Sequence, residues 1–218
     1  MIAIAIDGPG GAGKSTMARA LAKELGYIYV DTGALYRAIG LYMRRKGIPT
    51  TDFAAVAGNL GGVEVRLAFR DGEQRVFLAE EDVSDAIRTQ DISIAASNVS
   101  AVPEVRAFLF DLQRDLAKKN HVVMDGRDIG TVVLPNAQVK IFLTASPEER
   151  AQRRYLELRE KGLEAEYDQV LTELKQRDYD DSHRAVAPLV PAEDAIMVDS
   201  TGLTREQAFQ RLLRTVQD

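Results

Sequence analysis

A glycine-rich run near the N-terminus has the residue types and spacing of a phosphate-binding loop. It follows the pattern Gly-x4-Gly-Lys-Ser/Thr and reads Gly8-Pro9-Gly10-Gly11-Ala12-Gly13-Lys14-Ser15, followed by Thr16. Glycines let the backbone approach so closely that successive N–H groups point at phosphate oxygens, and the positive end of a following helix adds to the attraction. We expect Lys14 to reach the β and γ phosphates of a nucleotide and Ser15 to supply a hydroxyl to Mg²⁺.

An aspartate at the end of an apolar run is the second candidate metal ligand. Asp125 directly follows the apolar residues 122–124. A carboxylate at a strand end can bind Mg²⁺, directly or through water, beside a phosphate-binding loop. It can equally serve as a cap or pair with Arg127, and the residues alone leave both roles open.

The charge balance predicts a local basic cluster. Lys and Arg number 28 against 33 Asp and Glu, and the net charge of −5 disfavours binding to nucleic acid or anionic lipid. An anionic ligand must therefore be held locally. Arginine presents a planar fork suited to phosphate, so a set of arginines expected at strand ends or helix starts predicts that the phosphoryl acceptor is itself a phosphate ester. The set is Arg37, Arg106, Arg127, Arg177 and Arg184.

Alternating strands and helices must position these groups. Five short apolar runs predict buried parallel strands, at residues 2–6, 27–30, 122–124, 139–143 and 195–198. Helical patterns lie between them, such as Met17, Leu21 and Leu25 at i, i+4 and i+8. The alternation indicates an α/β fold with a doubly wound five-stranded parallel sheet.

Local signals place the ends of several helices. Ser146, with Pro147 and Glu149 after it, and Thr204, with Gln207 three residues later, are typical of helix starts. Glycines stand where helices are expected to end, at Gly26 and Gly47.

A different period appears between residue 61 and about residue 88. Apolar residues stand at every second position at Val63, Val65, Leu67 and Phe69. The turn signal Asp71-Gly72 follows, and a second apolar run comes at 76–78. This pattern predicts a small antiparallel insert in the α/β core. Residues 147–184 are rich in Arg, Glu and Asp, which predicts an exposed helical excursion.

Several function classes are excluded or disfavoured. The chain has no cysteine, which removes thiol nucleophiles and cysteine-ligated metals. No Asn-Lys-x-Asp motif occurs, which disfavours a GTPase switch. A signal peptide and a membrane span are not expected, since the N-terminal apolar run is short and no apolar stretch reaches 18 residues. His121 and His183 lack partners at ligand or triad spacing, so we interpret them as structural or solvated.

Three segments resemble the motifs of the bacterial cytidylate kinase family. They are Asp31-Thr32-Gly33-Ala34-Leu35-Tyr36-Arg37, Asp125-Gly126-Arg127-Asp128-Ile129-Gly130-Thr131 and the run from Arg177 to Leu189. The resemblance covers essentially the whole chain, including the antiparallel insert. It implies a P-loop NTPase fold and a nucleoside monophosphate kinase of pyrimidine nucleotide metabolism.

The resemblance further implies the reaction and the parts of the molecule. The reaction is Mg²⁺-dependent transfer of the γ-phosphoryl group of ATP to CMP or dCMP, giving CDP or dCDP and ADP, by a cytoplasmic monomer without nucleic-acid or membrane partners. The chain would form a single domain, with a core at about 1–32, 99–146 and 185–218. A monophosphate-binding segment with the insert would span about 33–98, and a short helical lid about 147–165 would close over ATP with basic residues such as Arg150, Arg153 and Arg154.

Residue roles are also implied by the resemblance. Besides the loop residues 8–16, ATP would be bound by Arg153 and Arg154. CMP would be bound by Thr32, Tyr36, Arg37, Ser97, Arg106, Arg127, Asp128, Arg177, Asp181 and Arg184. Within this set Ser97, Arg106 and Asp128 would contact cytosine, and Arg177 and Asp181 the sugar. The residues at the transferring phosphoryl group would be Lys14, Arg127, Arg177 and Arg184.

The residues predict which base the acceptor carries, and two other functions remain open. The Asp128 carboxylate can accept from the amine of cytosine but would face a carbonyl in uracil, which predicts CMP over UMP. One alternative is a kinase of another acceptor, such as UMP or a non-nucleotide metabolite. The other is a nucleotide-binding regulatory module without transfer activity. The sequence offers no motif that distinguishes ATP from GTP.

Overall fold

The structure, a computed structural model, describes residues 1–70 and 73–217. Two compact units share the chain: residue 1 with residues 28–122, and residues 2–27 with the chain from residue 123 to the C-terminus. The turn predicted at Asp71-Gly72 lies outside the described residues. No helix within the described ranges is both long and apolar enough to cross a membrane.

A five-stranded sheet has the order β2-β6-β1-β7-β8. Its strands are β1 (Ala3–Asp7), β2 (Ile28–Asp31), β6 (Val122–Gly126), β7 (Val139–Thr144) and β8 (Ile196–Asp199). β1 pairs in parallel with β7, with Ile6 opposite Ile141, and β7 pairs in parallel with β8. The five predicted strands are confirmed to within a few residues, but the prediction that all are buried is wrong for β8, because Ile196 and Met197 are exposed at an edge of the sheet. All of β1 is buried, as its continuous apolar run predicts.

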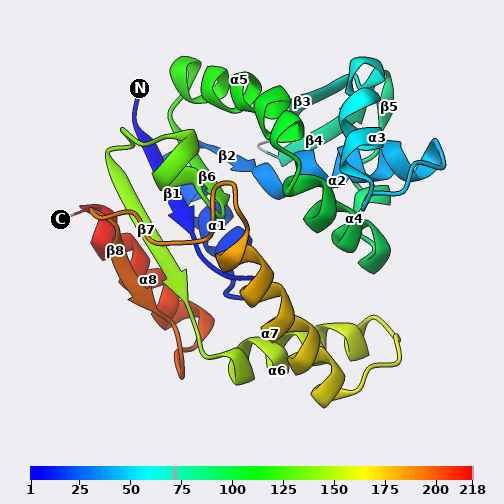
Figure 1. Ribbon diagram of the computed structural model, residues 1–218. Helices are drawn as coiled ribbons and strands as arrows, with labels where there is room; N and C mark the ends of the chain where they lie inside the picture. Colours follow the sequence, from blue (N-terminus) through cyan, green and yellow to red (C-terminus); the bar gives the residue numbers. More distant parts are fainter. Residues whose placement is uncertain (71–72, 218) are drawn as a thin grey trace. The chain divides into compact units, whose positions relative to one another are not determined.

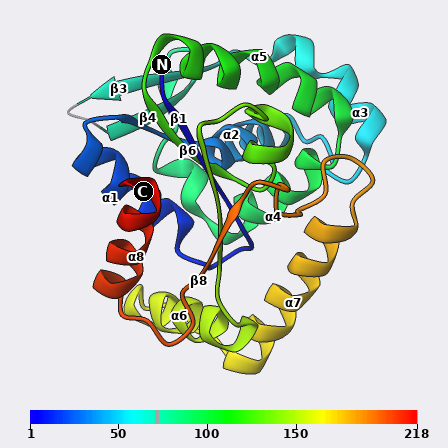
Figure 2. The same ribbon diagram turned by 90° about the vertical axis from the view of Figure 1, so that its left-hand side faces the viewer.

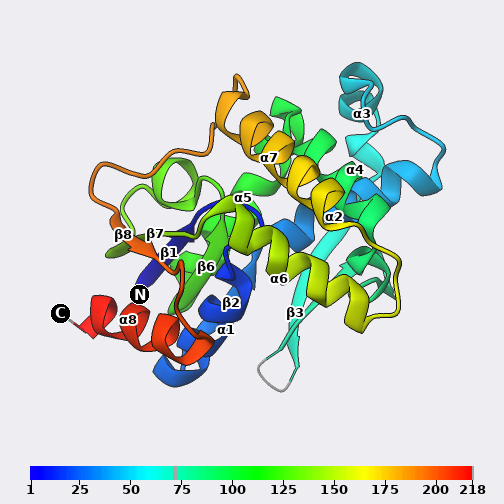
Figure 3. The same cartoon turned by 90° about the horizontal axis from the view of Figure 1, so that it is seen from below.

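Five helical segments belong to the unit that contains β1. They are α1 (Lys14–Leu25), a π-helical turn η3 (Ile129–Val133), α6 (Pro147–Glu160), α7 (Tyr167–His183) and α8 (Arg205–Gln217). α6 and α7 pack side by side (Figure 1), which confirms the helical excursion. Figure 3 shows α8 lying along α1, and the two helices are in contact.

Capping explains where several of these helices begin and end. The Ser146 hydroxyl accepts from Glu149 N at 3.3 Å at the start of α6. Before α8, Thr204 N donates to Gln207 Oε1 at 2.9 Å and Gln207 N donates to Thr204 Oγ1 at 3.2 Å, which completes the predicted capping box. Gly26 ends α1 with a φ of 67°, as predicted.

The unit of residues 28–122 contains the insert. Its antiparallel sheet has β3 (Val65–Arg70), β4 (Glu73–Leu78) and β5 (Glu81–Asp82), and Figure 2 shows β3 beside β4. The helical segments of this unit are α2 (Thr32–Arg45), α3 (Phe53–Gly58), η1 (Leu60–Gly62), η2 (Ala86–Arg88), α4 (Gln90–Ser100) and α5 (Pro103–Lys119). The small antiparallel insert is therefore confirmed.

One apolar core supports this unit. Leu35, Ile39 and Met43 of α2 are fully buried at helical spacing. They belong to a cluster that includes Val76 and Leu78 of β4. The insert is thus anchored to α2 by shared core residues, so its strands have a fixed place beside the start of that helix.

Candidate functional site

The glycine-rich run forms a tight loop between β1 and α1. Gly8 has a φ of +147°, and a Cβ there would lie 2.0 Å from the carbonyl oxygen of Leu143. Gly13 is the N-cap of α1 with a φ of 87°. L-residues with side chains rarely adopt such backbone angles, and none would fit at Gly8, so the loop needs glycine at both places. The α1 helix begins directly after the loop, so its N-terminal N–H groups can bind an anion held there.

Lys14 lies buried over this loop. Its Nζ donates to the carbonyl oxygen of Pro9 at 2.8 Å, and the residue is 6% exposed. Burial lowers the pKa of Lys14 well below its usual value, and the positive charges of Arg127 and Arg177 lower it further, against the opposing pull of Asp125. A buried ammonium ion surrounded by guanidinium groups is ready for a strongly anionic ligand.

Ser15 and Asp125 come together across 110 residues of sequence. The Ser15 hydroxyl donates to Asp125 Oδ2 at 2.9 Å. A hydroxyl and a carboxylate are the hard oxygen ligands that Mg²⁺ prefers, with water and phosphate oxygens completing its octahedron. Within residues 1–70 and 73–217 no group of three or more His, Cys, Asp or Glu side chains could hold a metal ion by itself. The residues present fit a magnesium ion carried with a bound nucleotide.

Three of the predicted arginines gather near the loop in the same unit. A Cβ at Gly10 would lie 3.6 Å from Arg127 Nη2 and 3.9 Å from Arg177 Cδ. Arg127 Nε donates to Asp181 Oδ2 at 2.8 Å. Burial raises the pKa of Asp181, but Arg127 and Arg177 outweigh it and hold that pKa below its usual value.

The third arginine, Arg184, directly follows α7. Its Nε donates to the carbonyl oxygen of Ala187 at 2.6 Å, and its Nη2 lies 3.7 Å from Oδ1 of Asp128, which is 4% exposed. The expected placement at strand ends or helix starts is right for Arg127 and Arg106. Arg37 lies in the second turn of α2. The expectation is wrong for Arg177, which lies in the interior of α7, because that helix already begins at Tyr167.

The loop is also tied to α6 and α7 by Arg150. This guanidinium is 3% exposed, and it donates to the carbonyl oxygens of Ala145 and Gly10, each at 2.9 Å. Its two terminal nitrogens donate to Asp178 at 3.1 and 2.6 Å. Burial and four protein acceptor atoms hold Arg150 in the interior of this unit, so the exposure predicted for residues 147–184 is wrong at this position. The place of Arg150 in a lid over ATP stays a prediction.

The other two lid arginines are partly exposed on α6. Arg153 is paired with Glu149 and donates to the carbonyl oxygen of Ser200 at 3.2 Å. Arg154 donates to Glu157 at 2.9 Å. Arg153 therefore contacts the buried Ser200, whereas Arg154 contacts an exposed residue of its own helix.

A second group of predicted residues lies in the unit of residues 28–122. The Asp31 carboxylate caps α2 by accepting from Ala34 N at 3.0 Å, and it lies 3.5 Å from Arg37 Nη1 and 3.2 Å from Arg88 Nη1. Burial raises the pKa of Asp31, but the two guanidinium groups outweigh it and hold the pKa below its usual value. Two arginines on one carboxylate leave a net positive charge for an anionic ligand. Thr32, the first residue of α2, is buried beside this cluster.

The predicted cytosine-binding residues of this unit lie on α4 and α5. Arg106, in the first turn of α5, is 8% exposed and lies 5.8 Å from the centre of the Tyr36 ring. Its Nη1 donates to the carbonyl oxygen of Ser100 at 3.4 Å. The carbonyl oxygen of Ser97 accepts from the Ser100 hydroxyl at 2.8 Å. These contacts link Tyr36, Ser97 and Arg106 to one part of this unit.

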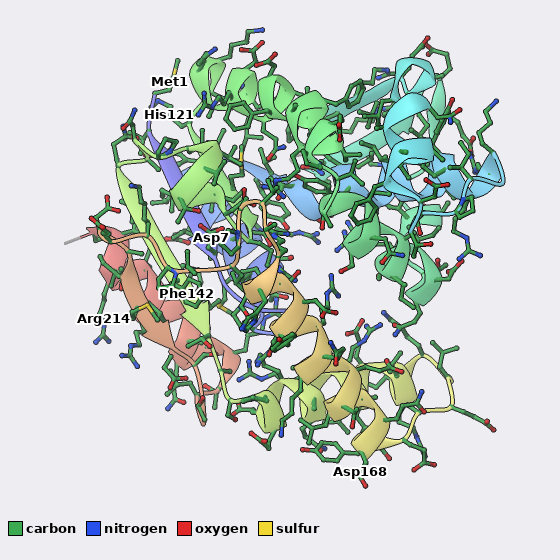
Figure 4. The ribbon with its side chains drawn as sticks, in the orientation of Figure 1. Met1, Asp7, His121, Phe142, Asp168 and Arg214 are labelled. Atoms are coloured by element: carbon green, nitrogen blue, oxygen red, sulfur yellow. The ribbon has the colours of Figure 1, made fainter. Side chains whose placement is uncertain are left out.

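Several polar residues of these clusters were not among the sequence-predicted set. Asp7, at the end of β1 (Figure 4), accepts from Ile129 N at 2.8 Å and Gly130 N at 2.7 Å. These bonds tie the β1 strand end to the segment that follows Asp128. The others are Gln74, Arg88 and Asp178. A strand-end aspartate was a usable signal for Asp7, whereas nothing in local spacing marks the other three.

Comparison with known proteins identifies the family. The family model described as cytidylate kinase matches residues 4–218. A cytidylate kinase of Caldicellulosiruptor saccharolyticus is 53% identical over 97% of this chain and 94% of that protein. A cytidylate kinase of Pasteurella multocida is 47% identical over 99% of this chain and 95% of that protein.

A solved structure supports the fold alone. The shikimate kinase of Bacteroides thetaiotaomicron has a TM-score of 0.50 and 14% identity, over 100% of this chain and 99% of that one. Its similarity agrees with an α/β fold built around a phosphate-binding loop. With a family model over almost the whole chain and relatives near half identity, this chain belongs to the cytidylate kinase family.

Proposed function

We propose that this kinase transfers the γ-phosphoryl group of ATP to CMP or dCMP, giving CDP or dCDP and ADP. The observation that carries the proposal is the network around the phosphate-binding loop. There the buried Lys14 ammonium is surrounded by Arg127, Arg177 and Asp181. A transfer between two phosphates gathers negative charge in one place, and these cations can neutralise it.

The phosphate of the acceptor needs its own cations. We assign it to Tyr36, Arg37, Arg127 and Arg184, and the family to which the chain belongs supports that assignment. An oxygen of the acceptor phosphate forms the new bond to the γ phosphorus. The bond to the β–γ bridging oxygen breaks, and ADP leaves with that electron pair. The acceptor is already an anion near neutral pH, so no general base is needed.

Base recognition is assigned to Ser97, Arg106 and Asp128, and sugar recognition to Arg177 and Asp181. Asp128 is buried, so its carboxylate would have to pair with a donor when a base covers it. The exocyclic amine of cytosine is such a donor, and the carbonyl of uracil is not. Thr32 belongs to the same acceptor site, at the start of α2.

Magnesium is assigned to Ser15 and Asp125, whose oxygens already lie 2.9 Å apart. Bound together with ATP, the ion would neutralise part of the negative charge of the phosphates. The loop residues 8–16 would hold the triphosphate. We assign Arg153 and Arg154 to ATP as well, from the partly exposed side of α6.

The chain divides, in our proposal, into a core and two smaller parts. We propose a core at about residues 1–32, 99–146 and 185–218, a monophosphate-binding segment at about 33–98 and a lid at about 147–165. Closing a lid over ATP would exclude water and limit wasteful hydrolysis. We propose that the enzyme works as a cytoplasmic monomer, without nucleic-acid or membrane partners.

The test is ADP production from Mg-ATP with CMP, dCMP, UMP, AMP and GMP, one at a time. We expect turnover with CMP and dCMP, and its loss in Lys14→Ala. Turnover with AMP or UMP alone would refute the acceptor assignment while leaving the loop assignment intact. The absence of ADP production with all five acceptors would favour a non-nucleotide acceptor or a regulatory module. Asp128→Ala should reduce the CMP-to-UMP preference, and an unchanged ratio would remove Asp128 from base recognition.

A further inference from the structure

Gln74 of β4 links the antiparallel insert to the Asp31 cluster. Asp31 N donates to Gln74 Oε1 at 2.9 Å, and Gln74 Nε2 donates to the carbonyl oxygen of Asp31 at 3.2 Å. β2, which ends at Asp31, is an edge strand of its sheet. The side-chain amide thus pairs with the backbone of Asp31 as a peptide group of a neighbouring strand would.

Asp31 is the residue on which the cluster depends. Its carboxylate accepts from Ala34 N and lies within ion-pair distance of Arg37 and Arg88. The side chain of Asp31 is 5% exposed, whereas those of Arg37 and Arg88 are 24% and 48% exposed. The Asp31 carboxylate is the most buried member of the cluster, and both guanidinium groups pair with it. A contact that holds the backbone of Asp31 in place therefore also holds the carboxylate with which Arg37 and Arg88 pair.

The strand that carries Gln74 is itself well held. Gln74 stands opposite Phe69 in the β3–β4 register, and Val76, two residues along, is buried in the core shared with α2. Val76 N donates to the Ser84 hydroxyl at 2.9 Å. Gln74 therefore projects from a strand that is paired with β3 and anchored in the core, which restricts the positions that its amide can take.

We propose that Gln74 is a positioning residue for the acceptor phosphate: it holds Asp31, and through Asp31 it orients Arg37 and Arg88. The proposal deepens the proposed function and rests on the assignment of Arg37 to the phosphate of CMP. It gives the insert a role in catalysis, because the insert supplies a contact that sets an acceptor-binding arginine. It also adds Arg88 to the cations that face this phosphate.

A merely structural role for Gln74 would have a different signature. If the amide only covers an open strand edge, its loss would lower the free energy of unfolding and leave the substrate constants alone. If it orients Arg37, its loss must raise KM for CMP and spare KM for ATP, which is bound by residues 8–16. Measuring both constants on one variant separates the two roles.

The variant is Gln74→Met, which keeps the length of the side chain and removes both hydrogen bonds. We expect KM for CMP to rise about three- to tenfold, with KM for ATP and kcat within about twofold, as the loss of one or two ordinary hydrogen bonds would give. The matched control is Glu73→Met, the same replacement at an exposed neighbour on the same strand. It should leave all three constants unchanged. Continued turnover shows that each variant is folded.

A double-mutant cycle with Arg37→Ala supplies the decisive comparison. Arg37→Ala alone should raise KM for CMP, and Gln74→Met should raise it by a smaller factor in that background than in the native chain. An equal factor in both backgrounds overturns the positioning role, as does a Gln74→Met enzyme with native KM for CMP. If Arg37→Ala leaves KM for CMP unchanged, the acceptor assignment is wrong and the proposal falls with it.

Discussion

Arg127 and Asp181 form a buried ion pair at the centre of the loop-bearing unit, with Nε and Oδ2 2.8 Å apart and side chains 21% and 8% exposed. The pair joins the segment after β6 to α7. It also stands close enough to the buried Lys14 for both charges to act on that ammonium ion. The Asp181 carboxylate thus offsets part of the positive charge that Lys14, Arg127 and Arg177 bring together.

Removing that carboxylate should destabilise the protein and its acceptor site together. Asp181→Asn keeps the shape but leaves the Arg127 guanidinium unpaired, which costs about 3 kcal/mol when the partner of a buried pair is lost. We expect the free energy of unfolding, from urea denaturation, to fall by about that amount and KM for CMP to rise. Asp180→Asn, at the exposed neighbouring position, is the control and should match the native chain. A native stability for Asp181→Asn would contradict the pairing.

ATP binding should weaken as pH rises through the lowered pKa of Lys14. Burial and the nearby arginines lower that pKa, so the free enzyme loses this positive charge at a lower pH than an ordinary lysine. Only the protonated ammonium binds phosphate well. Calorimetric Kd values for ATP across the alkaline range should therefore rise in the native protein. In Lys14→Arg, whose guanidinium stays charged, the rise should vanish. A parallel rise in both proteins would assign the effect to another group.

Stability should fall with rising pH because of Asp7. Burial raises the pKa of Asp7 from 3.8 to about 6, although the N–H groups of Gly130 and Ile129 oppose the shift. The folded state therefore keeps a proton that the unfolded state has lost between these values, which makes the free energy of unfolding fall by about 3 kcal/mol as pH rises from 4 to above 6.

Asp7→Asn tests this, because an amide cannot ionise. Urea denaturation at pH 4.5 and pH 7.5 should show the variant losing more stability relative to the native chain at the lower pH. Carboxyl groups with depressed pKa values, such as Asp82 at about 2, are ionised at both pH values and cancel from the comparison. An identical native-minus-variant difference at the two pH values would show that Asp7 is ionised throughout.

Arg150 should affect ATP rather than CMP. Arg150→Lys keeps the charge but cannot reach Gly10, Ala145 and Asp178 together, so the Gly10 carbonyl of the loop loses its donor. We expect KM for ATP to rise about fivefold, as the loss of one hydrogen bond worth about 1 kcal/mol would give, with KM for CMP changed less. Arg159→Lys, on the exposed last turn of α6, is the matched control. A larger effect on CMP than on ATP would place Arg150 in the acceptor site.

Much of the fold follows from local sequence. Runs of apolar residues ending in Asp7 and Asp31 predict strands because a strand buried on both faces must be apolar throughout. The run ending in Asp199 also forms a strand, but that strand lies at an edge of the sheet and is largely exposed. The Thr204 capping box is a contact within four residues.

The phosphate-binding loop is also predicted from local sequence, and the left-handed backbone of Gly13 meets a local requirement for glycine. The lack of space for a side chain at Gly8 comes instead from the carbonyl oxygen of Leu143, far along the chain.

Tertiary structure decided which side chains meet. Ser15 and Asp125 are 110 residues apart, and Gln74 and Asp31 are 43 apart, so no local pattern relates them. The arginines show the same division. Their number and type predict a phosphate site, but only packing buries Arg150 against protein acceptors and leaves Arg37 and Arg88 partly exposed on one carboxylate. Burial is a property of the assembled elements, so the sequence alone does not determine which guanidinium groups are held by protein acceptors.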